Sequence, residues 1–142
     1  MGNSTKRAWA GAAMALFASS VAWADEGPAC REWKLDGLYV FSATGFTNST
    51  VPKAIVELIR FNGDGTLSVP GGTLSVAGNI VPIPPGTSTG SYTLDADCRG
   101  TLVFSPSGLS FNIFASPRGD DLWMIQTNAG NVFQGNVTKV AP

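Results

Sequence analysis

The sequence contains no histidine among its 142 residues. This absence excludes Ser-His-Asp and Cys-His nucleophilic machinery, and it excludes zinc, copper and haem sites that rely on histidine ligands. Any acid–base chemistry must therefore come from carboxylates, tyrosine, lysine, water or backbone dipoles. No motif in the chain is diagnostic of catalysis, and we expect neither a metal nor a cofactor.

The chain also lacks charge except in a few places, and its first segment has the pattern of a secretory signal peptide. Lys6 and Arg7 precede an apolar run at 8–22, and a small-residue cleavage sequence ends at Ala24. A membrane anchor is the alternative interpretation. It is weaker, because the apolar run is about 15 residues long and a spanning helix needs roughly 20.

We therefore predict a signal peptide at 1–24 and a single mature domain at 25–142, exported to the periplasm or secreted. The mature chain keeps seven Lys/Arg against ten Asp/Glu, a net charge of −3, because two cations leave with the signal. No Lys/Arg cluster is present, which argues against nucleic acid and anionic membranes as partners. No second apolar run approaches membrane-spanning length. The sequence leaves the oligomeric state open.

Cysteine is scarce as well, and both copies lie in the predicted mature chain, at Cys30 and Cys98. An even pair in an oxidising compartment predicts a disulfide. Metal binding is the rival, but two isolated cysteines without histidine cannot build a usual zinc site. Cys98 lies in a turn that we predict from Asp95 to Arg99, so the bridge would tie this turn to the start of the mature chain.

Almost nothing after residue 35 has a helical period, and β-branched or aromatic residues fill the intervals between Gly and Pro, as in all-β domains. A meander of about eight strands that closes into a barrel would leave no exposed edge, whereas a two-sheet sandwich is the competing arrangement. Strands are expected near 37–43, 54–61, 66–69, 73–76, 87–94, 100–104, 109–115, 122–127 and 132–140.

Two segments carry more specific expectations. GTLSV occurs twice within 65–76, which predicts two like strands folded about Pro70-Gly71-Gly72. The segment VPIPPG at 81–86 predicts no regular pairing, because proline lacks the hydrogen-bond donor of the ladder. We interpret it as a stiff crossover or as a lid over one end of the domain.

Glu57 is the most suggestive single residue, because it shares one face of its predicted strand with Ile55, Ile59 and Phe61. If this face is buried, the pKa of the carboxyl rises, and Glu57 becomes a weak candidate for a general acid or base, or for a contact to a polar ligand group. The alternative is a solvated or ion-paired carboxylate. The other candidate ligand-binding residues, for which ordinary packing or surface exposure is the alternative, are Tyr39, Tyr92, Asn112, Trp123 and Gln126.

Three stretches carry a family resemblance: LDGLYVF at 35–41, IVELIRFNGDGTLS at 55–68 and TGSYTLDADCRGTLVF at 89–104. Together they resemble the small exported bacterial proteins of the allene oxide cyclase barrel-like group, which is similar to the lipocalin-like (calycin) barrels. The resemblance implies an eight-stranded antiparallel barrel with a central cavity for small apolar molecules. Some relatives cyclise or isomerise bound polyenes without a cofactor, but none of their catalytic residues is matched to a position here.

Three functions follow as hypotheses. The first is an exported barrel that binds a small hydrophobic ligand in its lumen. The second is a cofactor-independent cyclase or isomerase that folds its substrate in a shaped apolar cavity. The third is a structural or interaction protein whose lumen is filled with side chains. A cavity lined by Glu57 and aromatic residues would favour the first two.

Overall fold

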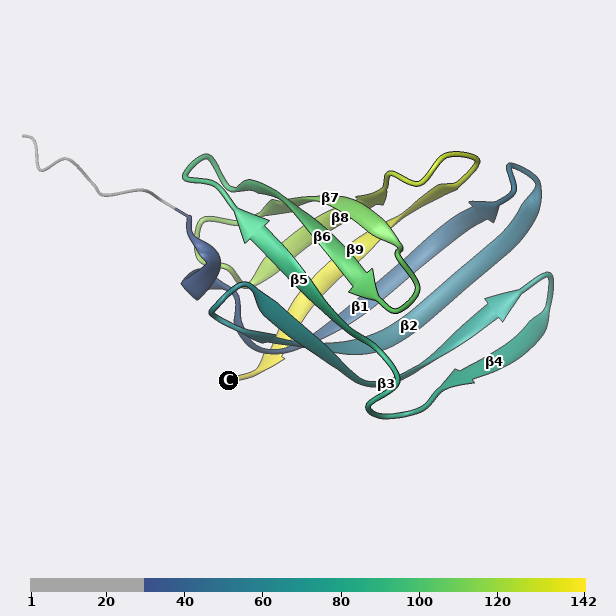
Figure 1. Ribbon diagram of the computed structural model, residues 1–142, viewed down its shortest axis with the longest axis horizontal. Helices are drawn as coiled ribbons and strands as arrows, with labels where there is room; N and C mark the ends of the chain where they lie inside the picture. The colour runs from purple at the N-terminus through teal and green to yellow at the C-terminus, as the bar shows by residue number, and fades with distance from the viewer. Residues whose placement is uncertain (1–29) are drawn as a thin grey trace, which may run out of the picture.

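The computed structural model describes residues 30–142, so the predicted signal peptide at 1–24 lies outside the described residues. The described chain is almost entirely β-structure, as the spacing of turns and β-branched residues predicted (Figure 1). Its elements are η1 (Glu32–Lys34), β1 (Asp36–Thr47), β2 (Val51–Asn62), β3 (Thr66–Val76), β4 (Asn79–Ile83), β5 (Thr89–Leu94), β6 (Arg99–Ser105), β7 (Ser110–Ala115), β8 (Asp121–Gln126) and β9 (Val132–Ala141).

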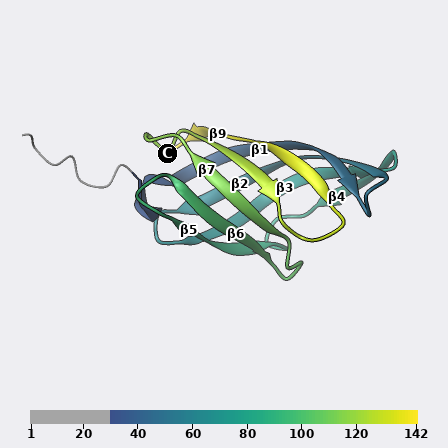
Figure 2. The ribbon, with the colours of Figure 1, turned by 90° about the horizontal axis from the view of Figure 1, so that it is seen from above.

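Eight of the strands form a closed antiparallel barrel. The sheet runs in the order β2-β1-β9-β8-β7-β6-β5-β3-β4, and pairing of β2 with β3 closes it. Closure leaves β4 as one additional strand outside the ring. Strands of the two walls cross at an angle in the view from above, as the tilt of a closed barrel requires (Figure 2). The prediction of an all-β, eight-stranded antiparallel barrel is confirmed.

The segment 65–76 does not fold as two strands about Pro70-Gly71-Gly72, so that prediction is wrong. One continuous strand, β3, pairs with β2 along its length, and the register shifts between Leu58 and Arg60. Two residues, Val69 and Pro70, therefore stand against one residue of β2. A β-bulge of this kind accommodates a proline and bends the strand, which lets β3 continue instead of turning back.

The prediction that 81–86 makes no regular pairing is also wrong for the first half of this segment. Val81, Pro82 and Ile83 belong to β4, which pairs with the second half of β3. Proline is tolerated there because β4 is an edge strand, whose second side needs no donor. β5 pairs with β3 only over Thr66–Ser68, so the β3–β4 hairpin leaves the barrel wall and projects past it (Figure 1).

One end of the barrel, here called the closed end, carries η1 and the β2–β3, β5–β6 and β7–β8 turns. Cys30 is fully buried there and forms the predicted disulfide with Cys98. Cys98 lies in the expected turn, since its amide donates to the carbonyl of Asp95 at 2.9 Å. A disulfide is consistent with an oxidising environment. The bridge holds η1 across this end of the lumen.

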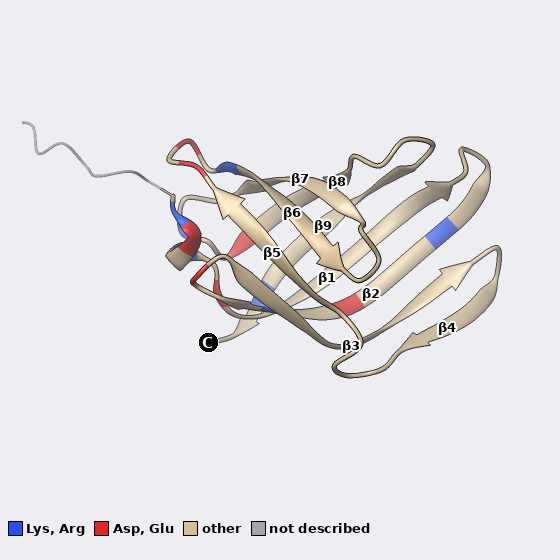
Figure 3. Cartoon of the chain, viewed as in Figure 1, with Lys and Arg blue, Asp and Glu red and all other residues tan. Residues whose placement is uncertain are grey.

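The other end, here called the open end, carries the β1–β2, β6–β7 and β8–β9 turns. Most charged residues gather near η1 and the β5–β6 turn, and few lie toward the open end (Figure 3). Inward-facing residues alternate with outward-facing ones along each barrel strand, and the inward set forms a single apolar core. No helix in the described part of the chain is long and apolar enough to span a membrane.

Candidate functional site

The lumen is filled with side chains toward the closed end and hollow toward the open end. Near the closed end, Phe61 packs edge-to-face between Tyr39 and Tyr92, with ring centroids 5.1 Å and 5.0 Å away. The hollow half encloses a cavity of about 180 Å³. Its lining residues are Phe41, Lys53, Ile55, Glu57, Leu74, Ile83, Ser88, Phe104, Ser107, Leu109, Phe111 and Phe133. Apolar side chains dominate this lining, and four of them are phenylalanines.

Phe41, Phe104, Phe111 and Phe133 give the cavity its shape. The Phe111 ring meets Phe41 and Phe104 edge-to-face, with centroids 6.1 Å and 5.8 Å apart, and Phe133 meets Phe41 at 6.3 Å. Edge-to-face contacts of this kind fix ring orientation, because the positive edge of one ring faces the negative face of the next. The cavity therefore has an aromatic wall whose ring orientations are fixed.

Glu57 lies in this cavity, on the inward face of β2, and its side chain is 6% exposed. Burial raises the pKa of its carboxyl to about 7. No hydrogen bond or ion pair in the described residues involves this carboxyl, and no fully buried polar atom there lacks a partner. The carboxyl oxygens therefore keep some accessible surface, and Glu57 is among the residues that line the cavity. Glu57 is thus an unpaired acid in the wall of the cavity.

The register of the sheet explains how a glutamate fits at this point. Phe41 of β1 stands opposite Glu57 on one side, and Gly72 of β3 stands opposite it on the other. A Cβ atom on Gly72 would collide with the Cβ atom of Glu57. The glycine therefore makes room for the glutamate beside the β3 bulge.

A second charged residue, Lys53, lies on the same face of β2 nearer the open end. Its Nζ atom donates to Oε1 of Gln126 at 3.3 Å and lies 3.9 Å from the ring centroid of Phe133. Partial burial lowers the pKa of the ammonium group. Gln126, which is 6% exposed, in turn donates from Nε2 to Oδ1 of Asn128 at 3.1 Å. The open half of the lumen thus contains one cation and one acid that do not pair with each other.

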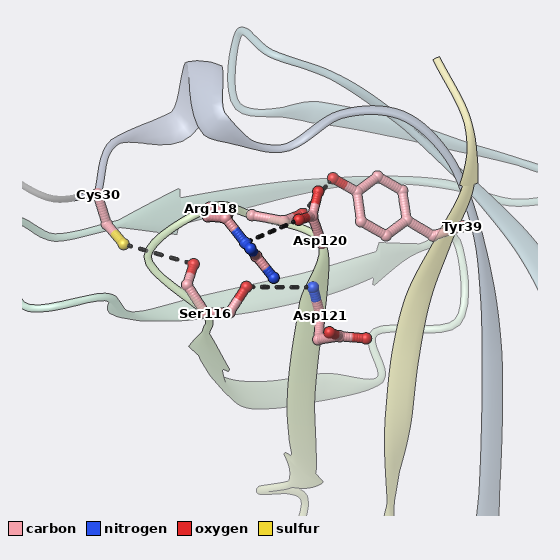
Figure 4. Close-up of polar contacts among 7 residues, drawn as sticks. Cys30, Tyr39, Ser116, Arg118, Asp120 and Asp121 are labelled. Carbon is pink, nitrogen blue, oxygen red and sulfur yellow. Dashed lines mark hydrogen bonds and ion pairs between the residues drawn. The ribbon is translucent and has the colours of Figure 1, made fainter.

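Two of the other sequence candidates, Tyr39 and Tyr92, face the lumen at the closed end, where they act as structural ties. The Tyr39 hydroxyl donates to the carbonyl of Gly119 at 2.6 Å, and Figure 4 shows its ring reaching toward the β7–β8 turn. The Tyr92 hydroxyl lies 2.9 Å and 3.0 Å from the carbonyls of Glu32 and Leu35. Burial raises the pKa of both phenols to about 12, so they remain donors. Neither residue lines the cavity.

Asn112 and Trp123, which the sequence marked as candidate ligand contacts, do not line the lumen either. Asn112 is exposed, and Trp123 is 52% exposed on the outer wall beside Phe114, its partner across the strands. Their neighbours Phe111, Ile113, Leu122 and Met124 are the inward residues. Because side chains alternate along a strand, only one of the two sets can face the lumen.

Trp123 belongs instead to a hollow of about 540 Å³ on the outer wall, which also includes Ser42, Phe114 and Gln134. This hollow is larger than the lumen cavity, but it is an open trough on the outer surface of the sheet. It contains no buried ionisable group. The lumen cavity encloses apolar surface together with Glu57 and Lys53, and we therefore take it as the candidate site.

Of these polar residues, Glu57 and Gln126 were selected from the sequence, whereas Lys53 and Asn128 were not. Alternation along 53, 55, 57, 59 and 61 places Lys53 on the face of Glu57, so a signal for Lys53 was present. Asn128 lies in the β8–β9 turn, and no local pattern links it to a residue of β2. In residues 30–142, no group of three or more His, Cys, Asp or Glu side chains could hold a metal ion.

No model of a known protein family matches the chain. No characterised protein matches its sequence. Among solved structures, the chain is similar to a redesigned β-barrel, mFAP1, bound to DFHBI, with 15% sequence identity and a TM-score of 0.47. The match covers 76% of this chain and 97% of that one. The barrel architecture therefore rests on the strand pairing described above.

Proposed function

We propose that the protein binds a small hydrophobic ligand in the open half of its barrel. The observation that carries this proposal is the hollow left between Phe41, Phe104, Phe111 and Phe133, in a barrel whose other half is packed. An eight-stranded barrel has room for one small ligand or for packed side chains alone, and this chain combines the two. A purely structural or interaction protein would have a lumen filled with side chains throughout, and the cavity argues against that hypothesis.

The proposal extends to the whole chain. Residues 1–24 act as the signal peptide and 25–142 form the single ligand-binding domain, exported to the periplasm or secreted. The Cys30–Cys98 disulfide supports this location, because such bonds persist in oxidising compartments. Membership of the allene oxide cyclase barrel-like group is part of the proposal. It is supported by the closed antiparallel topology.

The binding proposal is tested with the fluorescent apolar probe N-phenylnaphthylamine and a variant that fills the cavity. We expect Leu109→Trp, at the cavity lining, to weaken probe binding at least about tenfold, because the indole occupies the space of the probe. Val103→Trp is the matched control, since Val103 is exposed on the outer wall of β6 and should leave binding unchanged. Equal probe binding by both variants would show that the probe does not occupy the lumen.

Glu57 favours a second function, a cofactor-independent cyclase or isomerase. An unpaired carboxyl with a pKa of about 7 can donate or accept a proton near neutral pH. A flexible polyene held against the phenylalanine wall would then be folded for reaction while Glu57 steers the developing charge.

Glu57→Gln separates the two functions, because the amide keeps the shape of the side chain and cannot exchange a proton. For a binding protein, we expect the affinity for N-phenylnaphthylamine to stay within about twofold. For an enzyme, we expect turnover to fall about a hundredfold or more. The substrate for this assay is identified by native mass spectrometry of the protein purified from its own host. A polyene that co-purifies with the protein is the compound to use. An unchanged turnover in Glu57→Gln would rule out acid–base catalysis by this residue.

A further inference from the structure

The open half of the lumen presents a positive charge that no described residue neutralises. Two ion pairs occur within residues 30–142, Arg99 with Asp97 and Arg118 with Asp120, and neither involves Lys53. Glu57 lies four residues along the same strand, which separates the two Cα atoms by about 13 Å at the usual strand rise. No ion pair of the described chain joins Glu57 to Lys53. The ammonium group of Lys53 therefore lacks an anionic partner, although it is half-buried.

A chain of hydrogen bonds fixes the position of this ammonium group. The backbone N–H of Ser110 can only donate, so Oδ1 of Asn128 accepts a hydrogen bond from it at 2.8 Å. Nδ2 of Asn128 donates to the carbonyl of Gly108 at 3.1 Å. Because Oδ1 of Asn128 is an acceptor, Gln126 must present Nε2 to it at 3.1 Å, which turns Oε1 of Gln126 toward Lys53. The orientation of both amides is thus set by backbone groups.

This arrangement leaves the ammonium group ready to bind an anion. One of its three N–H donors is used by Gln126. The ammonium group also lies over the Phe133 ring, in a cation–π contact. Two donors remain for a ligand. Neutral partners compensate only part of the cost of removing a cation from water, and a carboxylate would compensate more of it. A dianion would bring excess charge into an apolar cavity with a single cation.

From these contacts we propose that the ligand is an amphipathic monocarboxylic acid. Its carboxylate pairs with Nζ of Lys53 and its apolar body extends past Ile55 toward Glu57. The proposal rests on lumen binding as the function and adds the ligand class. The cavity of about 180 Å³ has room for about six water-sized groups, which suits a chain of medium length. Glu57 then contacts the inner end of the ligand, away from the carboxylate.

The test compares three probes with the same apolar chain and different head groups: octanoate, octanol and octylammonium. Calorimetric titration is done at about pH 6, where Lys53 is charged. We expect octanoate to bind about 10- to 100-fold more tightly than octanol, as a charge-assisted hydrogen bond would give. We expect octylammonium to bind most weakly. Lys53→Met should reduce octanoate to the affinity of octanol and leave octanol unchanged, whereas Lys53→Arg should keep the preference.

Lys139→Met is the matched control, because Lys139 lies at the closed end, with Nζ 6.0 Å from the ring centroid of Tyr39. It should keep the preference for octanoate. Equal affinity of the wild-type protein for octanoate and octanol, or a preference that survives in Lys53→Met, would overturn the assignment of Lys53 while leaving lumen binding in place. If none of the three probes binds, lumen binding itself fails, and the proposed ligand class fails with it.

Discussion

We expect Glu57→Gln to stabilise the protein at about pH 8 by about 2–3 kcal/mol and to leave its stability at about pH 4 unchanged. The reason is the raised pKa of the buried carboxyl, about 7 in the folded chain against an ordinary value of 4.5. Below 4.5 the carboxyl is protonated in both states and contributes nothing to the difference. Between 4.5 and 7 the unfolded chain releases the proton while the folded chain retains it, so stability falls as pH rises. Above 7 the folded chain bears the full cost of a buried carboxylate.

Urea unfolding of the wild-type protein and of Glu57→Gln across this pH range measures the effect. Glu32→Gln is the control of opposite sign, because backbone hydrogen bonds, including one from the Leu94 amide at 3.3 Å, lower the pKa of Glu32. At pH values above 4.5, the ordinary pKa of a glutamate, Glu32→Gln should therefore lower the free energy of unfolding, where Glu57→Gln should raise it. Parallel stability curves for wild type and Glu57→Gln would mean that Glu57 is solvated in the folded protein.

Removing the disulfide with the double variant Cys30→Ser, Cys98→Ser should lower the free energy of unfolding by about 4 kcal/mol. The bridge closes a loop with a sequence separation of 68, so its loss restores much conformational freedom to the unfolded chain. A loss of this size is a large share of the roughly 5–15 kcal/mol that stabilises a typical domain. Thermal unfolding of the double variant, and of wild type in reducing agent, should show the same lowered midpoint.

The structural change should be confined to the closed end, because the bridge holds the segment before η1 there. The Tyr92 hydroxyl contacts the carbonyls of Glu32 and Leu35, so hydrogen exchange of the amides around η1 should accelerate. Binding of N-phenylnaphthylamine at the open end should persist in the folded fraction. An unchanged unfolding midpoint in the double variant would show that packing of Leu35 and Tyr92 alone holds this end together.

The sequence predicted the strands well, because turn residues and alternation are local signals. It also placed Glu57 on one face with Ile55, Ile59 and Phe61, which recur at every second position around it, but it did not decide whether this face is inside or outside. It failed at β3, where a repeated GTLSV favoured two strands. Local pattern does not show that β2 is long enough to pair with both halves across a bulge. It failed at Pro82 for a related reason, since only the sheet order makes β4 an edge strand.

The polar part of the candidate site was less accessible to sequence reasoning. Lys53 and Gln126 are separated by 73 positions and meet because β2 and β8 contribute to the same lumen. Asn128 joins them from a turn, where no periodicity exists to place it. Trp123 and Asn112 were selected for their chemistry, but the alternation that buries Met124 and Ile113 turns them outward.

By itself, the sequence determined the all-β class, the disulfide pair and which residues share a face with Glu57. Each of these depends on composition, on the number of cysteines or on a period of two, all of which act over short stretches of chain. Closure of the barrel decided the rest. Pairing of β2 with β3 selected which set of alternating side chains became the lumen, and Leu74 and Ile83 of the β3–β4 hairpin became part of the cavity lining. These outcomes follow from contacts between distant strands, which no local pattern records.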